Sequence, residues 1–320
     1  MFAITATAIN PDDPLRGLTL GEVDDPQPQE GWVTVDVKAA SLNHHDIWTL
    51  RGVGIHDGRL PIVLGCDAAG FTPDGTAVVV HALIGPADVP DETMTEERSI
   101  LSERYDGTFA DKVVVPARNL IAKPDSLTFE EAACLPTAWL TAYRMLFVRG
   151  QLRPGQRVLI QGAGGGVATA ATVLARAAGA HVSVTSRDAA KLAQAQEIGA
   201  HAVYESGARL AERVDVVIET VGDATWSHSL KSLVPGGVLV VSGATSGQNP
   251  PADLARVFFR QLSVIGSTMG TRNEFVDLVR LLDATGARPI IADTMDMEDG
   301  RRAFTTLLDG DVFGKLVLTR

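Results

Sequence analysis

The feature that most constrains this chain is a glycine-rich turn between a short apolar run and a helical pattern. The segment RVLIQGAGGGVATAATVLARAAG, residues 157–179, starts as a buried strand and continues as a helix directly after four glycines. Glycines permit a tight turn and let a diphosphate approach the backbone, where the helix N-terminus offers free N–H groups. We therefore predict that five consecutive residues bind a dinucleotide: Ala163, Gly164, Gly165, Gly166 and Val167.

The residues around this turn repeat the same alternation of strand and helix. Short runs rich in Val and Ile, such as HVSVTS, VDVVIETVG and GGVLVVSG, are separated by helical patterns up to about residue 268. This alternation predicts an α/β fold with a doubly wound parallel sheet. Ligands bind at the carboxyl ends of the strands in such sheets, so we predict further cofactor contacts at the ends of three strands: Val221, Gly243, Thr268 and Met269.

The end of the second strand indicates which dinucleotide binds. An NAD site usually carries an acidic residue there, but this chain has Thr185 and Ser186, followed by Arg187 and, one helical turn later, Lys191. A hydroxyl and two cations suit a 2′-phosphate, so we predict NADP(H), bound by Ser186, Arg187 and Lys191. Asp188 lies one residue beyond Arg187, and we expect it to cap the following helix.

The N-terminal part of the chain is predicted to be mostly β. The segment GWVTVDVKAAS, residues 31–41, alternates apolar and polar residues as a half-buried strand does. Residues 85–106 are polar and contain prolines, which favours a long surface excursion. After residue 271 the pattern predicts a helix, a strand, a second helix and a last strand, GKLVLTR. These elements have no strand–helix–strand partner of their own, so we expect them to pack against the N-terminal part.

Composition excludes several classes of function. The chain has 320 residues and a net charge of −11, and a basic stripe of the kind that binds nucleic acid is not visible. Its sequence contains neither a signal-peptide pattern nor an apolar run long enough to span a membrane. Its two cysteines, Cys66 and Cys134, fit reduced thiols better than a disulfide framework. We expect a cytoplasmic protein without nucleic-acid or membrane partners.

With these motifs in place, the chain resembles the medium-chain dehydrogenase/reductase superfamily, on its zinc-free, quinone oxidoreductase-like side. The matching blocks follow the family order from LPIVLGCDAAG and GTFADKVVVPA through the glycine turn to FFRQLSVIGSTMG and FGKLVL. The resemblance implies a GroES-like, mostly-β catalytic domain from residues 1–123 and 269–320, and a Rossmann domain from residues 124–268. It also implies hydride transfer with a nicotinamide cofactor, and a homodimer or homotetramer.

The segment SLNHHDIW, residues 41–48, raises the question of a metal. In zinc-dependent members of the superfamily, three separated positions hold the catalytic zinc, and they match Asn43, Cys66 and Thr137 here. Only the cysteine is a good zinc ligand. The neighbouring histidines, His44 and His45, point in different directions on either a helix or a strand, so they do not readily share one ion. We therefore predict no metal site, with Asp46 and one histidine orienting the loop.

A metal-free pocket is then predicted around this loop. We predict Asn43, His44 and His45 as catalytic residues, because the family pattern places Asn43 beside the nicotinamide. Four residues are predicted to line the substrate pocket: Trp48, Cys66, Thr137 and Trp139. Each has an ordinary alternative, since Trp139 lies in an apolar helical pattern and Cys66 is equally compatible with a buried structural thiol.

Three hypotheses for the function follow from these patterns. The first is a zinc-independent, NADPH-dependent oxidoreductase that reduces quinones or α,β-unsaturated carbonyls, since without a Lewis acid the substrate must itself be activated. The second is an alcohol dehydrogenase-type oxidoreductase, with or without metal assistance. The third is a non-catalytic, crystallin-like NADPH-binding protein.

Overall fold

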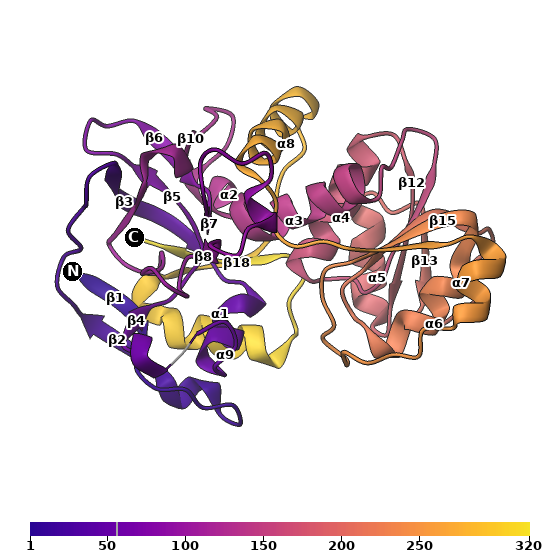
Figure 1. Cartoon of the computed structure of the whole chain (residues 1–320), viewed down its shortest axis with the longest axis horizontal. Coiled ribbons are helices and arrows are strands. Elements are labelled where there is room, and N and C mark those ends of the chain that lie inside the picture. The colour runs from indigo at the N-terminus through magenta and orange to yellow at the C-terminus, as the bar shows by residue number, and fades with distance from the viewer. Residues whose placement is uncertain (56) are drawn as a thin grey trace. The chain divides into compact units, whose positions relative to one another are not determined.

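The computed structural model describes residues 1–55 and 57–320, and the chain divides into two compact units. The first unit contains Met1–Ala138, Thr271–Asp283 and Pro289–Arg320, and the second contains Trp139–Gly270 and Ala284–Arg288. The first unit therefore extends past residue 123, where the sequence places a boundary, and both chain termini belong to it (Figure 1). The helix α2 (Phe129–Ala133) accounts for the difference, because it packs on strands of the first unit.

The first unit is built around a seven-stranded, mainly antiparallel sheet. Its central strand, β3 (Trp32–Ser41), has the expected alternation, with Val35 and Val37 buried and Asp36 and Lys38 exposed. The other six strands of this sheet are β5 (Asp67–Phe71), β6 (Ala77–Val80), β9 (Lys112–Pro116), β10 (Leu120–Ala122), β17 (Ile291–Asp296) and β18 (Lys315–Thr319). Strand β18 pairs antiparallel with β3, so the C-terminal segment packs on the N-terminal part as predicted.

A second sheet and several helices complete the first unit. Three strands form the sheet, β1 (Phe2–Ala6), β2 (Leu18–Glu22) and β4 (Ile62–Val63). The α-helices are α1 (His44–Leu50), α2, α8 (Arg272–Thr285) and α9 (Gly300–Asp309). One apolar cluster joins residues from both sheets and from α9, with Phe109 and Phe304 in edge-to-face contact at 5.9 Å between ring centroids. Burial of this cluster is the main stabilising contribution in the unit.

The prediction that residues 85–106 form a surface excursion is wrong for five of these residues, which are buried: Glu92, Thr93, Ser99, Leu101 and Ser102. Strand β8 (Ser99–Ile100) pairs with β7 (Leu83–Ile84), and the adjoining Leu101 and Ser102 are fully buried. A short 3-10 helix, Glu92–Met94, also buries its first residue. The polar composition was misleading because contacts with distant residues bury these side chains; Leu101 O accepts a hydrogen bond from Cys66 Sγ at 3.3 Å.

The second unit contains the predicted parallel sheet. Its strands are β11 (Arg157–Ile160), β12 (His181–Ser186), β13 (Ala202–Glu205), β14 (Val214–Glu219), β15 (Leu233–Val241) and β16 (Ser263–Gly266). All neighbouring pairs are parallel, in the order β13-β12-β11-β14-β15-β16. The chain moves outward in one direction from β11 and then in the other from β14. This reversal creates the switch point at which such sheets bind ligands, and it confirms the predicted Rossmann architecture.

Five α-helices belong to the second unit. They are α3 (Leu140–Tyr143), α4 (Gly166–Ala177), α5 (Ala189–Glu197), α6 (Asp223–Ser232) and α7 (Leu254–Arg260). Helix α3 precedes the first strand, and the others follow strands of the sheet. The helical segment predicted from the sequence around Trp139 is not uniform, since π-helical stretches at Leu135–Trp139 and Arg144–Arg149 flank α3. Within residues 1–55 and 57–320, none of the helices combines the length and apolar character that a membrane crossing requires.

Candidate active site

The glycine turn follows β11 as predicted and has the backbone geometry that glycines allow. Gly162 and Gly164 have φ values of +79° and +98°, a conformation that other residues rarely adopt. Helix α4 begins at Gly166, with Gly165 at the N-cap, and no side chain among the described residues caps it. A Cβ atom built on Gly165 would meet no described atom within 4 Å. The turn therefore offers uncapped N–H groups and open space, which fits a diphosphate.

The other residues predicted to bind the cofactor also follow strands of this sheet. Ser186 ends β12, Val221 lies two residues after β14, and Gly243 lies two residues after β15. Thr268 and Met269 follow β16; Thr268 is exposed, while Met269 is buried with a φ of +48°. Since the strands are parallel, their carboxyl ends share one edge of the sheet. The sequence therefore identified the segments that meet at this edge.

At the end of β12, the residues predicted to face a 2′-phosphate have different surroundings. The Thr185 hydroxyl is fully buried, donating to Gln161 Oε1 at 2.6 Å and accepting from Gly162 N at 3.3 Å. Arg187 is exposed and Lys191 is half-buried. Asp188 caps α5 as predicted, since its Oδ1 accepts from the amides of residues 190 and 191 at 2.7 and 3.3 Å. Thr185 thus supports the glycine turn, and the two cations remain as candidates for a 2′-phosphate.

A buried hydrogen-bond network under this edge was not predicted. Glu219, at the end of β14, is fully buried, and its Oε1 accepts from the backbone N–H groups of Val221 and Gly222 at 2.8 and 3.0 Å. Its Oε2 accepts from the Ser229 hydroxyl at 2.6 Å, and that hydroxyl accepts from Gln161 Nε2 at 2.9 Å. Through Gln161 the network continues to Thr185 and the glycine turn. Glu219 therefore fixes the Val221 turn relative to the glycine turn.

In the first unit, the segment SLNHHDIW folds into the start of α1. Asn43 is the N-cap, and Asp46 Oδ2 accepts a hydrogen bond from the Asn43 backbone N–H at 2.7 Å, which forms half of a capping box. Burial raises the pKa of Asp46 to about 7. The prediction that Asp46 orients this loop through hydrogen bonding is consistent with these contacts.

The Asn43 side chain belongs to a buried polar cluster centred on Asp67. Asn43 Nδ2 donates to Asp67 Oδ2 at 2.8 Å, and Thr137 Oγ1 donates to Asp67 Oδ1 at 2.5 Å. The Lys315 ammonium donates to Asn43 Oδ1 at 2.6 Å and to Leu42 O at 2.5 Å, and lies 3.5 Å from Asp67 Oδ2. Asp67 and Lys315 have side-chain exposures of 0% and 3%. We call Asn43, Asp67, Thr137 and Lys315 the Asp67 cluster.

The three positions that match zinc ligands in the superfamily do not fit a zinc ion. Asn43 and Thr137 supply an amide and a hydroxyl, and both bond to Asp67, which a buried ammonium already accompanies. Cys66 is fully buried and its thiol donates to Leu101 O, while burial raises its pKa well above the ordinary value. Within residues 1–55 and 57–320, no three His, Cys, Asp or Glu side chains are grouped so that they could hold a metal.

The remaining predicted side chains differ in accessibility. His44 is exposed, whereas His45 Nε2 is buried and lies 3.9 Å from Glu103 Oε1. Trp48 is half-buried, and the Arg51 guanidinium lies over its ring, with 5.6 Å between Arg51 Cζ and the ring centroid. Trp139, assigned to the second unit, is fully buried, in keeping with the alternative that it belongs to the core.

Sequence reasoning missed Asp67 and Lys315 as parts of the same site. The only signal in the sequence is a charged residue at one end of each of two otherwise apolar strands, in GCDAAG and GKLVLTR. Glu219 had a similar signal, as the one acidic residue at the end of VDVVIE that is followed by a turn.

Comparison with known proteins gives matches in sequence and in fold that cover most of this chain. Residues 29–125 match the alcohol dehydrogenase GroES-like domain, and residues 166–284 match the zinc-binding dehydrogenase family. An acryloyl-coenzyme A reductase of Metallosphaera sedula is 30% identical, over 95% of this chain and 97% of the relative. A solved NAD-dependent alcohol dehydrogenase superposes with a TM-score of 0.93 at 31% identity, covering 100% of both chains.

A cobalt- and zinc-bound alcohol dehydrogenase of Pyrobaculum aerophilum superposes with a TM-score of 0.90 at 30% identity, covering 100% of this chain and 99% of that one. Together with the Rossmann sheet and the matching segments of the first unit, these similarities extend over nearly the whole chain. The chain therefore belongs to the medium-chain dehydrogenase/reductase superfamily and is an oxidoreductase of that family.

Proposed function

We propose that this oxidoreductase uses NADPH to reduce α,β-unsaturated carbonyls or quinones and works without a metal. The observation that carries the proposal is the Asp67 cluster, because Asn43 and Thr137, at two of the three positions that hold zinc in zinc-dependent members, bond to Asp67 through an amide and a hydroxyl, beside the buried Lys315 ammonium. A simple ketone needs strong polarisation before it accepts hydride, whereas an enone or quinone is already electron-poor. The similarity to an acryloyl-coenzyme A reductase supports this class, since an acryloyl group is an α,β-unsaturated thioester.

The second unit supplies the elements that would hold NADPH. The uncapped start of α4 would bind the diphosphate through its N–H groups and positive dipole end. Arg187 and Lys191 would bind the 2′-phosphate, because Thr185 and Ser186 stand at the end of β12, where an NAD site usually carries an acidic residue. Bound NADPH would supply the hydride for the reaction. Replacing Arg187 with Asp should therefore raise the KM for NADPH by about tenfold or more while changing that for NADH little.

Two of the predicted catalytic residues, Asn43 and His45, have contacts that suit a supporting role. Both ends of the Asn43 amide bond to protein groups, and His45 Nε2 is buried facing Glu103. We therefore assign Asn43 and His45 to positioning α1 and its surroundings. His44 is exposed, and we propose it as the proton donor. Replacing His44 with Gln should then lower kcat and change the pH profile of kcat.

The direct test is NADPH oxidation by chelator-treated protein, with 2-cyclohexen-1-one and cyclohexanone as a matched pair of acceptors. Turnover with the enone and not with the saturated ketone, unchanged after metal removal, is the expected result. Turnover that returns only with added Zn²⁺ would favour the second candidate, an alcohol dehydrogenase. The 30–31% identity to solved alcohol dehydrogenases over the whole chain supports that candidate. Tight NADPH binding with no acceptor reduced would favour a binding protein.

We also propose that the protein forms a homodimer through the edge of the parallel sheet. Strand β16 is an edge strand, and four large apolar side chains on it and on α7 are exposed: Leu254, Phe258, Phe259 and Val264. Phe259 is 78% exposed, and an open edge beside apolar side chains is a common surface for pairing. The sedimentation coefficient of the wild-type protein should be that of a dimer, and Phe259→Asp should shift it to that of a monomer.

A further inference from the structure

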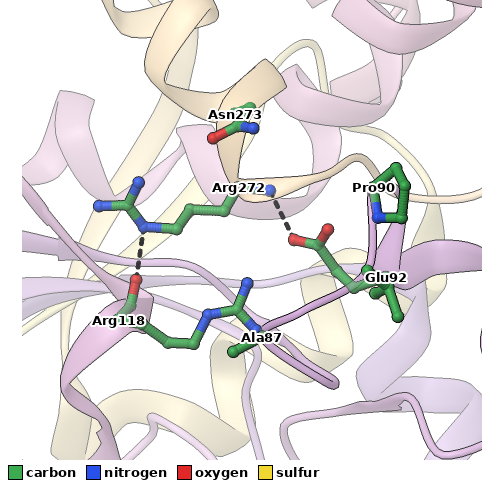
Figure 2. A pocket seen from close by; sticks show the side chains of 7 residues that line it. Ala87, Pro90, Glu92, Arg118, Arg272 and Asn273 are labelled. Atoms are coloured by element: carbon green, nitrogen blue, oxygen red, sulfur yellow. Dashed lines mark hydrogen bonds between the residues drawn. The ribbon is translucent and has the colours of Figure 1, made fainter.

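We propose that a cavity in the first unit binds a phosphoryl group through Arg118 and Arg272. The cavity has a volume of about 290 Å³, and its lining includes these two arginines, Glu92, Asn273 and residues of the 87–90 loop (Figure 2). All of these residues belong to the first unit and none belongs to the Asp67 cluster. The proposal therefore goes beyond the hydride-transfer function and does not depend on it.

The two arginine side chains are held by the protein backbone. Arg118 Nη1 donates to Gly85 O at 2.9 Å and to Pro86 O at 2.8 Å. Arg272 Nε donates to Arg118 O at 2.6 Å (Figure 2). These bonds occupy Nη1 of Arg118 and Nε of Arg272. Across the described ranges, 1–55 and 57–320, no carboxylate pairs with either guanidinium, and Nη2 of Arg118 and both Nη atoms of Arg272 lack a protein acceptor.

Glu92 lines the same cavity but is already engaged with other groups. Its Oε1 accepts the Arg272 backbone N–H at 2.7 Å and lies 3.6 Å from His81 Nε2, and the Glu92 side chain is buried. The carboxylate therefore serves to fix the first residue of α8 rather than to pair with a guanidinium. Two cations face one anion, in a protein whose net charge is −11. This local excess of positive charge requires an anionic ligand or solvent.

The start of α8 adds to the preference for an anion. Arg272 and Asn273 are the first two residues of this 14-residue helix, whose N-terminus carries the positive end of the helix dipole. Two guanidiniums anchored on separate segments can direct N–H groups at different oxygens of one acceptor. A phosphoryl group offers three such oxygens and up to two negative charges, whereas a carboxylate offers two oxygens in one plane. The geometry therefore favours a phosphoryl group.

The experiment is a calorimetric titration with inorganic phosphate at constant ionic strength, using variants at Asn273. This residue is exposed and has no described hydrogen bond to its side chain, so Asn273→Asp and Asn273→Lys should both fold. We expect the dissociation constant for phosphate to rise severalfold in Asn273→Asp and to fall severalfold in Asn273→Lys. Arg118→Gln and Arg272→Gln should each weaken binding by about tenfold, with Arg104→Gln, an exposed arginine of the same unit, as the matched control.

Phosphate bound at the proposed 2′-phosphate site of the second unit would respond to Arg187→Gln, and phosphate bound at the glycine turn would respond to neither Arg187→Gln nor the Asn273 pair, so these sites are distinguishable from the cavity. Titrations with adenosine monophosphate and with acetate complete the design. Tighter binding of the nucleotide than of phosphate, with the same response to the Asn273 pair, would mean that the phosphoryl group belongs to a larger molecule; equal or weaker binding would indicate free phosphate. Equal affinities of the two Asn273 variants, acetate binding as tight as phosphate, or no saturable binding would overturn the proposal.

Discussion

Replacing Lys315 with Met should destabilise the first unit strongly, because it removes the cation from a fully buried cluster. The methionine side chain has a similar length, so the packing volume changes little. Asp67 would keep three neutral donors, namely the Asn43 amide and the Ser41 and Thr137 hydroxyls, but would lose its charged neighbour at 3.5 Å. Asn43 Oδ1 and Leu42 O would lose their donor as well.

The magnitude follows from the burial of both charges. Removing one partner of a buried ion pair typically costs about 3–5 kcal/mol, because the other charge is left uncompensated. An exposed pair is worth roughly 0–1 kcal/mol. Lys112 provides the matched control, since it pairs with Asp25 in the same unit with side-chain exposures of 38% and 44%. We expect the free energy of unfolding to fall by about 3–5 kcal/mol in Lys315→Met and by less than about 1 kcal/mol in Lys112→Met.

Urea unfolding followed by circular dichroism measures both values, and hydrogen exchange of the β3 and β18 amides locates the loss in this sheet. The double variant Lys315→Met/Asp67→Asn should be less destabilised than the sum of the two single variants by about 1–3 kcal/mol, since it leaves no unpaired charge. If Lys315→Met lowers the free energy of unfolding no more than Lys112→Met does, the Lys315 ammonium does not compensate the charge of Asp67. That result would refute the argument that this ammonium accompanies Asp67 in place of a metal ion.

Three further predictions concern other buried groups. Burial raises the pKa of Asp46 from an ordinary value of 3.8 to about 7. Between pH 3.8 and pH 7 the folded protein therefore binds more protons than the unfolded chain. Stability should therefore fall as pH rises from about 4 to 7, by up to ~1.4 kcal/mol per pH unit, and level off above; urea unfolding of Asp46→Asn should show a shallower slope. Glu219→Gln should lower the free energy of unfolding by about 2–3 kcal/mol, because an N–H₂ group would face hydrogen-bond donors; an unchanged unfolding midpoint would contradict the network. Cys66 and Cys134 are fully buried, and burial raises the pKa of Cys134 to about 12. A thiol reagent should modify neither residue until the protein unfolds, and rapid reaction of either thiol in the native protein would refute this.

Local patterns predicted most of the second unit. A strand, a turn and a helix within residues 157–179 determine their own geometry through glycine conformations and apolar periodicity, so the sequence specified the turn and its place at the sheet edge. Residues 85–106 show the opposite case. Their polar composition indicated solvent exposure, but Leu101 and Ser102 are buried because they meet Cys66, which is 35 residues away from Leu101. Composition within a window does not report such contacts.

The Asp67 cluster depends on register, which explains why no single motif revealed it. In the seven-stranded sheet β3 lies between β5 and β18, and Ser41 pairs with Asp67 on one side and with Val317 on the other. Strand β18 is buried along four of its five residues, starting with Lys315, so its lysine has no solvent-facing side to occupy. A shift of one residue in either pairing would direct a charged side chain to the opposite face of the sheet. Lys315 and Asn43 are 272 residues apart in the chain, and only correct pairing of all three strands brings the ammonium to the amide and the carboxylate. The positive charge that compensates Asp67 therefore reaches it only in the assembled sheet. The segment SLNHHDIW was enough to raise the possibility of a metal site, but the groups that bond to Asp67 could be identified only from the folded structure.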